Sequence, residues 1–263
     1  MDLDLEGNVA VVAASSTGLG RASARAFAEE GANVVVNGRD AETLEATTEE
    51  LGADATGRVV PHAADLTDPD GPASLVERAV DEFGRLDHLV TNAGGPPSGP
   101  FLETTDAEWQ AAFDGLVMSA VRLVRAAAEP LSADGGGTVV CITSRSVKEA
   151  LDRLVLSNSV RMAVVGLEKT LSRELAPEVR VNTVMPGTHA TGRMTYLIER
   201  EVEAGVHDSF EAGTAAWAAD TALNRMGDPR RFGQVVAFLS SAPANFVTGA
   251  ALIVDGGDAR STL

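Results

Sequence analysis

Residues 9–20 read Val-Ala-Val-Val-Ala-Ala-Ser-Ser-Thr-Gly-Leu-Gly, and this stretch decides how the chain folds. Its first part is a short apolar run typical of a buried strand, and its second part is a glycine-bearing turn that leads into a helical pattern. At such a turn the free N–H groups that open the helix can hold a phosphate group. Gly18 and Gly20 allow close approach of the backbone, although glycines also occur in turns for steric reasons alone.

Short apolar runs alternate with helical patterns from this stretch to the end of the chain. The predicted strands are residues 9–13, 33–36, 59–62, 86–91, 138–142, 179–184 and 250–254. The predicted helices are residues 21–30, 40–51, 74–83, 106–128, 157–175 and 230–240, and Asp40 is the expected N-cap of the second. This alternation predicts a doubly wound, Rossmann-type α/β fold: a mainly parallel seven-stranded sheet with helices on both faces.

No linker, repeat or low-complexity segment interrupts the pattern, so the 263 residues are expected to form one domain, 1–263. The only long irregular stretch is 186–229, which has some helical character near 194–204. An insertion of this length is usually a lid or a binding loop, and a substrate-side lid is expected at about residues 187–228. A packing helix that does not move is the alternative.

The charge balance limits the possible partners. With 38 acidic and 21 basic residues, the formal net charge is −17, which disfavours nucleic acid and anionic membranes as partners. No apolar run approaches the roughly 18 residues that cross a bilayer. The N-terminus is acidic where a secretory signal would be basic, and Cys141 has no second cysteine to pair with, so a cytoplasmic protein is expected. An acidic surface poor in lysine fits adaptation to high salt and an ordinary acidic enzyme equally well.

Several further motifs follow the first turn in a fixed order. They are Asp65-Leu66, Thr91-Asn92-Ala93-Gly94, Pro186-Gly187 with Thr191, residues 225–229 and residues 254–257. With these motifs the chain resembles the short-chain dehydrogenase/reductase family over essentially its whole length, most closely the 3-oxoacyl-carrier-protein-reductase-like members. The resemblance implies a nicotinamide cofactor, a small-molecule substrate and a homotetramer or dimer built through residues 106–128 and 157–175.

The resemblance also implies which residues contact the cofactor. They are Ser15, Ser16, Gly18, Leu19, Gly20, Asp65, Leu66, Asn92, Ala93, Gly94, Arg161, Pro186, Gly187 and Thr191. Ala14 stands where the family's first glycine is usual. At the end of the second strand an acidic residue favours NAD and an arginine favours NADP, and here Arg39 precedes the first carboxylate, Asp40. NADP(H) is therefore predicted over NAD(H), unless Arg39 is simply a solvated surface residue; no metal site is predicted.

The catalytic set departs from the family pattern of asparagine, serine, tyrosine and lysine. Ser144 matches the serine, but Ser157 stands 13 residues later where the tyrosine is expected, and Arg161 replaces the lysine. Leu116 stands at the asparagine position. No shift of register restores the pattern, because the only tyrosine, Tyr196, lies far downstream.

These replacements change the expected chemistry. Arg161 keeps its charge at any working pH, so it could bind ribose hydroxyls and stabilise negative charge but could not shuttle a proton. The hydroxyl of Ser157 could orient a substrate or a water. Since a general acid or base contributes roughly 10²- to 10⁴-fold, hydride transfer without one is expected to be slow. Possible substitute proton donors are Tyr196, Lys148 and His189; Arg145 and Arg193 are candidates for binding an anionic substrate group.

Three functions remain open at this point. The first is an NADP(H)-dependent oxidoreductase acting on a small carbonyl or hydroxyl compound, with Ser144, Ser157 and Arg161 as its catalytic residues. The second is a catalytically silent nucleotide-binding homologue. The third is a non-redox lyase or isomerase on the same fold. Tight cofactor binding without turnover would indicate the silent homologue. Turnover of a substrate without nicotinamide would indicate the lyase or isomerase.

Overall fold

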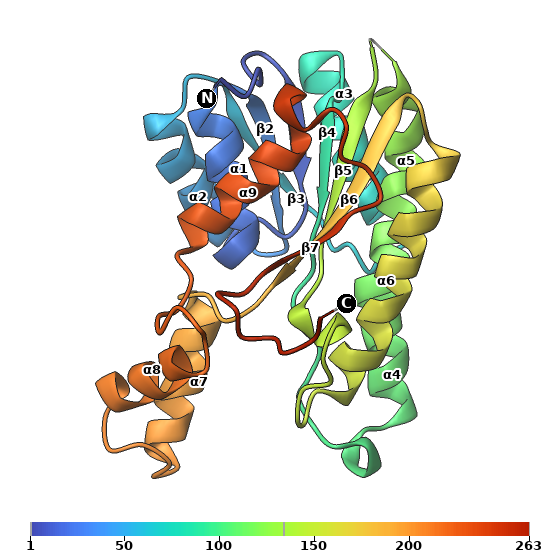
Figure 1. Cartoon of the computed structure of the whole chain (residues 1–263). Coiled ribbons are helices and arrows are strands. Elements are labelled where there is room, and N and C mark those ends of the chain that lie inside the picture. The colour runs from blue at the N-terminus through green and yellow to red at the C-terminus, as the bar shows by residue number, and fades with distance from the viewer. Residues whose placement is uncertain (1, 134, 263) are drawn as a thin grey trace.

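The computed structural model describes residues 2–133 and 135–262, and a seven-stranded sheet runs through its centre (Figure 1). The strands are β1 (Val9–Val12), β2 (Asn33–Gly38), β3 (Val59–Ala63), β4 (His88–Thr91), β5 (Gly137–Ile142), β6 (Val179–Pro186) and β7 (Ala251–Val254). Every neighbouring pair is parallel, in the order β3-β2-β1-β4-β5-β6-β7. The doubly wound parallel sheet predicted from the sequence is confirmed.

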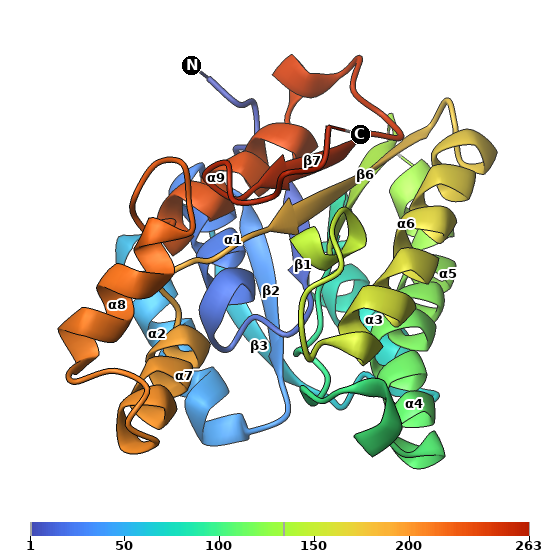
Figure 2. The same cartoon turned by 60° about the horizontal axis from the view of Figure 1, so that its bottom comes forward.

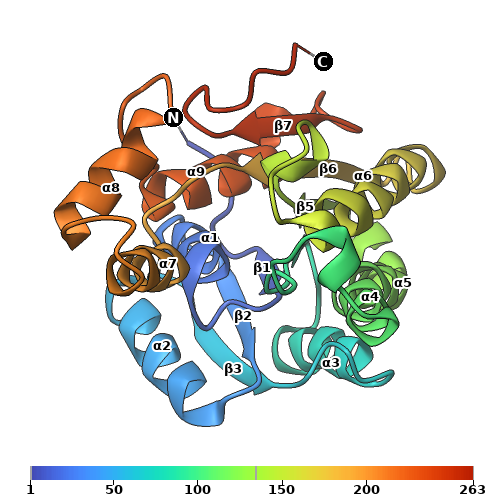
Figure 3. The ribbon, with the colours of Figure 1, turned by 90° about the horizontal axis from the view of Figure 1, so that it is seen from below.

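Helices cover both faces of the sheet (Figure 3). One layer holds α1 (Gly18–Glu29), α2 (Ala41–Asp54) and α9 (Pro229–Ser240), and the other holds α3 (Gly71–Phe83), α4 (Asp106–Phe113), α5 (Ser119–Ser132) and α6 (Val155–Glu174). A separate cluster of buried apolar side chains lies under each layer. Asp40 caps α2 as predicted, because its Oδ1 accepts a hydrogen bond from the Thr43 N–H at 2.8 Å.

The helix expected over 106–128 differs from the prediction. A five-residue π-helical turn, Asp114–Met118, separates α4 from α5. The apolar spacing continues across this turn, so the change in backbone hydrogen bonding leaves no mark on the periodicity. Single π-helical turns inside α-helices are frequently found at functional sites, and this one holds Leu116.

The irregular stretch at 186–229 contains two helices, α7 (Gly192–Glu203) and α8 (Phe210–Ala219), of which only the first was foreshadowed by the sequence. Figures 1 and 2 show the two helices together, projecting from one end of the sheet. The indole N–H of Trp217 in α8 donates to Oε2 of Glu201 in α7 at 2.8 Å. The pair is joined to the body near His189 and Gly227, which form an isolated β-bridge.

The order of the strands fixes where a ligand can bind. The chain winds outward from β1 to β3, then returns to place β4 on the other side of β1. In open α/β sheets ligands bind at this switch point, outside the carboxyl ends of the strands. The segments that follow β1, β4, β5 and β6 all meet there. No helix in residues 2–133 and 135–262 is long and apolar enough to span a membrane.

Candidate active site

The turn between β1 and α1 is held in place by two asparagines. Ala14 has a φ of 45°, in the left-handed region that costs a residue with a Cβ about 1–2 kcal/mol. Its N–H donates to Oδ1 of Asn37 and its carbonyl accepts from Nδ2 of Asn92, both at 3.1 Å. A Cβ on Gly20 would overlap that carbonyl, so the turn requires glycine at position 20. The two amide side chains thus maintain a conformation that position 14 would otherwise need glycine to adopt.

Ser15 and its neighbours in this turn point in different directions. The Ser15 hydroxyl donates to the Val12 carbonyl at 2.6 Å and accepts from the Asn37 N–H at 2.9 Å. Its own N–H donates to the Asn37 carbonyl at 2.7 Å. Ser15 is fully buried with both donors in use, so the structure gives no support to its predicted contact with a phosphate. Thr17, by contrast, is exposed at the N-cap of α1 and makes no capping bond, which leaves the first N–H groups of the helix free.

Arg39 lies at the end of β2, exposed and close to the turn. A Cβ on Gly38 would lie 2.9 Å from Cβ of Ser16, so Ser16 packs against the residue before Arg39. Asp65 follows β3; hydrogen bonds from Thr67, and more weakly the positive charge of Arg39, lower the pKa of its carboxyl. Ser16, Arg39 and Asp65 therefore lie near one another beyond the ends of β1, β2 and β3, and Leu66 is buried.

The backbone at the middle of the cleft is open. A Cβ on Gly18 or on Gly94 would meet no protein atom within 4 Å. Leu19 packs against the apolar cluster beneath α1, and Ala93 packs against the cluster on the other face. The Asn92 side chain is already engaged with Ala14, so a ligand would contact its backbone rather than its Nδ2.

The segment after β6 also lies at the carboxyl edge of the sheet. The Gly187 N–H donates to the Val254 carbonyl at 3.0 Å, and a Cβ here would overlap Asp255. Gly187 therefore lets Pro186 and the following residues pass beneath the end of β7. Thr191 is the N-cap residue of α7, and its side chain makes no capping bond.

Three serines gather after β5. Ser144 Oγ accepts from the Ser146 N–H at 3.1 Å, and the Ser146 and Ser157 hydroxyls lie 3.0 Å apart. Ser157 is only 7% exposed. The structure thus brings Ser144 and Ser157 together through Ser146, which had no signal in the sequence. The bond also shows that the Ser157 hydroxyl faces Ser146 within the protein.

Arg161 lies one turn further along α6, four residues after Ser157 and on the same face of the helix. Its Nη1 donates to the Thr143 carbonyl at 3.1 Å, and its side chain is 7% exposed. Burial, and then the charge of Arg193, lower the pKa of the Arg161 guanidinium to about 10, so the group stays charged at neutral pH. Among the described residues its Nε has no hydrogen-bond partner. It borders a cavity of about 10 Å³, near the size that holds one water, together with Asn92 and Leu116.

Comparison with known proteins agrees with this arrangement. The family model described as enoyl-(acyl carrier protein) reductase matches residues 13–258. The uncharacterized oxidoreductase YvrD of Bacillus subtilis is 32% identical over 269 residues, covering 99% of this chain and all of that protein. The short-chain dehydrogenase/reductase SDRA of Arabidopsis thaliana is 32% identical, covering 96% of this chain and 95% of that protein. The crystal structure of L-sorbose reductase from Gluconobacter frateurii, complexed with NADPH and L-sorbose, has a TM-score of 0.95 at 30% identity, covering 99% of this chain and 100% of that one.

The chain belongs to the short-chain dehydrogenase/reductase family. The predicted family is confirmed, and with it the predicted class of enzyme, an oxidoreductase. Leu116 stands where the resemblance predicts an asparagine. It lies 6% exposed in the π-helical turn and lines the small cavity beside Arg161, where it offers neither donor nor acceptor.

The three residues predicted as possible substitute proton donors in this short-chain dehydrogenase/reductase have different surroundings. His189 is buried: its Nδ1 lies 3.1 Å from the Gly187 carbonyl, its ring packs edge-on against Phe232, and burial lowers its pKa. Tyr196 is 58% exposed on α7, and Lys148 follows the short 3-10 helix Arg145–Val147. No hydrogen bond among the described residues joins any of these three side chains to Ser144.

The two arginines predicted to bind an anion differ in their surroundings. Arg145 forms ion pairs with Asp258 at 3.1 Å and with Glu149 at 3.8 Å. Those carboxylates already neutralise it, which argues against its predicted contact with an anionic substrate. Arg193 forms no ion pair with the described residues, and its guanidinium lies against Gly95.

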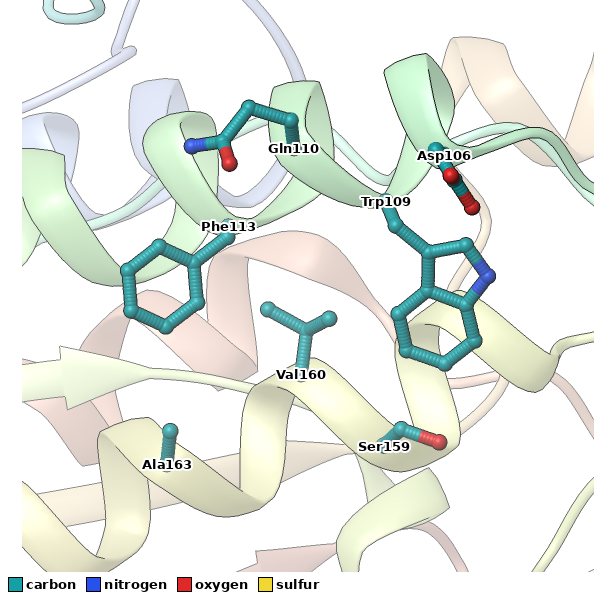
Figure 4. Close-up of a pocket in the computed structure, with 7 residues that line it drawn as sticks. All are labelled: Asp106, Trp109, Gln110, Phe113, Ser159, Val160 and Ala163. Atoms are coloured by element: carbon teal, nitrogen blue, oxygen red, sulfur yellow. The ribbon is translucent and has the colours of Figure 1, made fainter.

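One cavity of this short-chain dehydrogenase/reductase is lined by none of the predicted catalytic or cofactor residues. It is a groove of about 470 Å³ between α4 and α6, shown in Figure 4 and lined by Asp106, Trp109, Gln110, Phe113, Ser159, Val160 and Ala163. All seven lie on the helices that the sequence resemblance predicts to join subunits. In residues 2–133 and 135–262 no cluster of three or more histidine, cysteine, aspartate or glutamate residues could hold a metal ion.

The sequence analysis did not predict that Asn37 and Asn92 support the turn at Ala14, or that Ser146 lies between Ser144 and Ser157. Asn37 did carry a signal, because it is a polar residue directly after an apolar run and just before Gly38. It is fully buried, and its Nδ2 also donates to the His62 and Ala64 carbonyls at 3.2 and 3.1 Å. One side chain therefore ties the ends of β1 and β3 to β2.

Proposed function

We propose that this protein is an NADP(H)-dependent oxidoreductase that acts on a small carbonyl or hydroxyl substrate. The observation that carries the proposal is the arrangement at the start of α1: free N–H groups after Thr17 lie beside Ser16, and Ser16 packs next to the segment that presents Arg39. A guanidinium and a hydroxyl suit a 2′-phosphate. Arg39 forms no ion pair with a described carboxylate, so its charge is available to a ligand.

The open backbone at Gly18 and Gly94 fits a dinucleotide that lies along the carboxyl edge of the sheet. The residues proposed to hold it are Ser16, Gly18, Leu19, Gly20, Arg39, Asp65, Leu66, Asn92, Ala93, Gly94, Arg161, Pro186, Gly187 and Thr191. When bound, the nicotinamide supplies a hydride to a carbonyl carbon or accepts one from an alcohol. The NADPH complex of the L-sorbose reductase supports this choice of cofactor.

At the substrate, the residues of this chain orient and stabilise charge. Ser144 is proposed to donate to the substrate oxygen. Arg161, buried and charged, stabilises the negative charge that builds on that oxygen during reduction. Ser157 cannot replace a phenol as an acid, since its hydroxyl is hydrogen-bonded with Ser146 and is far less acidic. The proton is therefore proposed to come from water, which makes turnover slow.

One observation favours a second candidate, a nucleotide-binding protein without turnover. No acidic group of suitable pKa in the described residues is hydrogen-bonded to Ser144. Such a protein would bind NADPH as tightly as the proposed enzyme. Single-turnover measurement separates the two, because a slow enzyme oxidises bound NADPH when a ketone is added and a silent homologue does not.

The test is a titration of the purified protein with NADPH and NADH, followed by nicotinamide fluorescence at low and at molar salt. We expect micromolar binding of NADPH and weaker binding of NADH. Binding of neither at any salt would overturn the oxidoreductase proposal. Conversion of a substrate without nicotinamide would favour a lyase or isomerase instead.

We further propose a cytoplasmic homo-oligomer, a tetramer or dimer, that uses the helices at 106–128 and 157–175. Phe113 and Met162 support this, because they are large apolar side chains that lie 42% and 52% exposed on these helices, Phe113 at the rim of the groove in Figure 4. Light scattering after size exclusion would give the mass. A monomer of 27.2 kDa at micromolar concentration would contradict the proposal.

A further inference from the structure

The lid carries an arginine into the cleft. Arg193 lies in the first turn of α7, two residues after Thr191. A Cβ on Gly95 would overlap the Arg193 guanidinium, so this group lies directly against the backbone that follows Asn92-Ala93-Gly94. Asn92 in turn is bonded to Ala14, in the turn before α1. Arg193 therefore reaches from the lid to the side of the cleft where the segments after β1 and β4 meet.

This arginine has no counter-charge. It makes no hydrogen bond or ion pair with any residue in 2–133 and 135–262. The positive charge of Arg193 acts on a second guanidinium, that of Arg161. The buried Nε of Arg161 also lacks a hydrogen-bond partner among these residues. Arg145, in the same region, is matched by two carboxylates. Two neighbouring guanidinium groups, neither of which forms an ion pair with a described carboxylate, favour the binding of an anion beside them.

The helix ends around Arg193 point to the same kind of ligand. Thr17 and Thr191 are the N-cap residues of α1 and α7; both have extended backbones, and neither side chain caps its helix. The helices α2, α4, α8 and α9 are capped by their own side chains, whereas α3, α5 and α6, like α1 and α7, are not. Figures 1 and 3 show that α7 begins near the edge of the sheet at which α1 begins. The free N–H groups and positive helix ends attract phosphate in particular.

We propose that Arg193 binds the diphosphate of the nicotinamide cofactor from the lid, opposite the start of α1. The inference rests on the proposed function, and it concerns a residue that the sequence analysis named only as a candidate for binding an anionic substrate group. The contact with Gly95 places the guanidinium against the segment after β4, whose Asn92 is hydrogen-bonded to the turn before α1. Its planar N–H donors can bind two phosphate oxygens at once. The lid and the sheet thus hold the same ligand, with Arg161 beside it at the adjoining ribose.

The test compares wild type with Arg193→Gln, Arg193→Lys and the matched control Arg200→Gln, an exposed arginine in the last turn of the same helix. Three probes are titrated: NADPH, 2′-phospho-ADP-ribose, which keeps the diphosphate, and adenosine 2′-monophosphate, which lacks it. We expect R193Q to bind the first two about tenfold more weakly, a loss typical of one charge-assisted hydrogen-bonded contact, and the third unchanged. R193K should lose less, because it keeps the charge, and R200Q should match wild type.

Salt gives a readout that a purely structural role would not move. The difference in NADPH affinity between wild type and R193Q should be largest at low ionic strength and shrink at molar salt, because an exposed charge is screened. Unfolding curves of all variants control for folding. R193K that binds NADPH like wild type while R193Q does not would assign the effect to charge and sustain the proposal.

Several results would overturn the inference. Unchanged affinity of R193Q for NADPH would do so, and so would an equal loss for adenosine 2′-monophosphate. Unchanged NADPH affinity with a raised KM for carboxylate substrates would assign Arg193 to the substrate instead. If wild type binds neither NADPH nor NADH, the proposed function fails by itself; inorganic diphosphate then decides, since binding that requires Arg193 sustains the diphosphate site and no binding overturns it.

Discussion

The two sides of the proposed binding site differ in how they accommodate departures from the family pattern. On the side of β1 and β2, one departure from the family pattern, Ala14, is compensated by two asparagines that hold its backbone. On the side of β5 and α6, Leu116, Ser157 and Arg161 stand where the resemblance predicts asparagine, tyrosine and lysine, and no acidic side chain among the described residues is hydrogen-bonded to Ser144. A turn depends on backbone geometry, which several side chains can enforce, whereas proton transfer depends on one group with a suitable pKa. Losing a motif residue therefore has unequal consequences in the two places.

The largest effect is expected from restoring the acid. The triple variant L116N/S157Y/R161K should raise kcat for NADPH-dependent ketone reduction by about 10²-fold or more, because a general acid contributes roughly 10²- to 10⁴-fold. Single-turnover kinetics over a panel of ketones measures it. Ser159→Tyr, on the groove side of α6, is the matched control and should leave the rate unchanged. No gain in a folded triple variant that binds NADPH would show that the two sides differ in more than these residues.

The next largest effect, on stability, is expected from replacing Glu168, which like Arg161 is a buried ionisable residue of α6. Glu168 is 1% exposed, and burial raises the pKa of its carboxyl to about 7, from 4.5, with Lys169 opposing the shift. The folded protein thus holds this proton more tightly than the unfolded chain does. The resulting stability is present below pH 4.5 and is lost between pH 4.5 and 7.

Glu168→Gln removes that loss, so the variant should exceed wild type by about 3 kcal/mol in free energy of unfolding at pH 8 and match it near pH 4.5. Urea denaturation at the two pH values measures the difference. Glu174→Gln, an exposed position near the end of the same helix, controls for net charge. A difference that does not change with pH would contradict the buried-charge interpretation.

Arg39 tests the side that kept its motif. Arg39→Gln should lower the ratio of NADPH to NADH affinity by about 10- to 30-fold, because a hydrogen bond to a charged group is worth roughly 1.5–3 kcal/mol, less at an exposed site. Fluorescence titration of both cofactors gives the ratio, and Arg21→Gln, an exposed arginine of α1 paired with Glu50, is the control. An unchanged ratio would make Arg39 a solvated surface residue.

The smallest effect is expected at the compensated position. Ala14→Gly should raise the free energy of unfolding by at most about 1 kcal/mol, because the gain from relieving the left-handed φ is reduced by the greater freedom of glycine in the unfolded chain. Asn92→Ala should lower it by more, since it removes the bond to the Ala14 carbonyl. Thermal unfolding of the two single variants and the double variant measures the coupling. Additive effects would show that Asn92 does not compensate for Ala14.

The sequence was sufficient for the sheet and its helices because both periodicities extend over several turns or residues. Strand and helix positions agree within about three residues, except where the pattern carries no information about hydrogen bonding, as at Asp114–Met118. Helix α8 was not predicted because its apolar residues contact only part of the lid and show little segregation to one face.

Site residues could be predicted by type but not by orientation. Ser15 and Ser16 are adjacent and chemically identical, yet one is buried beneath the turn and the other lies against Gly38. Arg145 and Arg193 are equivalent in the sequence as candidates for binding an anion, but Arg145 is paired with Asp258, which lies far along the chain. The serines after β5 show the same limit, since the partner of Ser157 is Ser146, across a loop and a helix start.

The amide bonds around Ala14 bear on how relatives of this chain are recognised. A sequence pattern that requires glycine at position 14 assumes that only glycine can adopt the left-handed φ of this turn. Such a pattern would miss chains in which two asparagines hold that conformation, as they do here. Asn37 and Asn92 lie 23 and 78 residues from the turn they support. A search that scored those two amides together with Gly20 would test for the turn itself, and would separate chains that lost the glycine from chains that lost the fold around it.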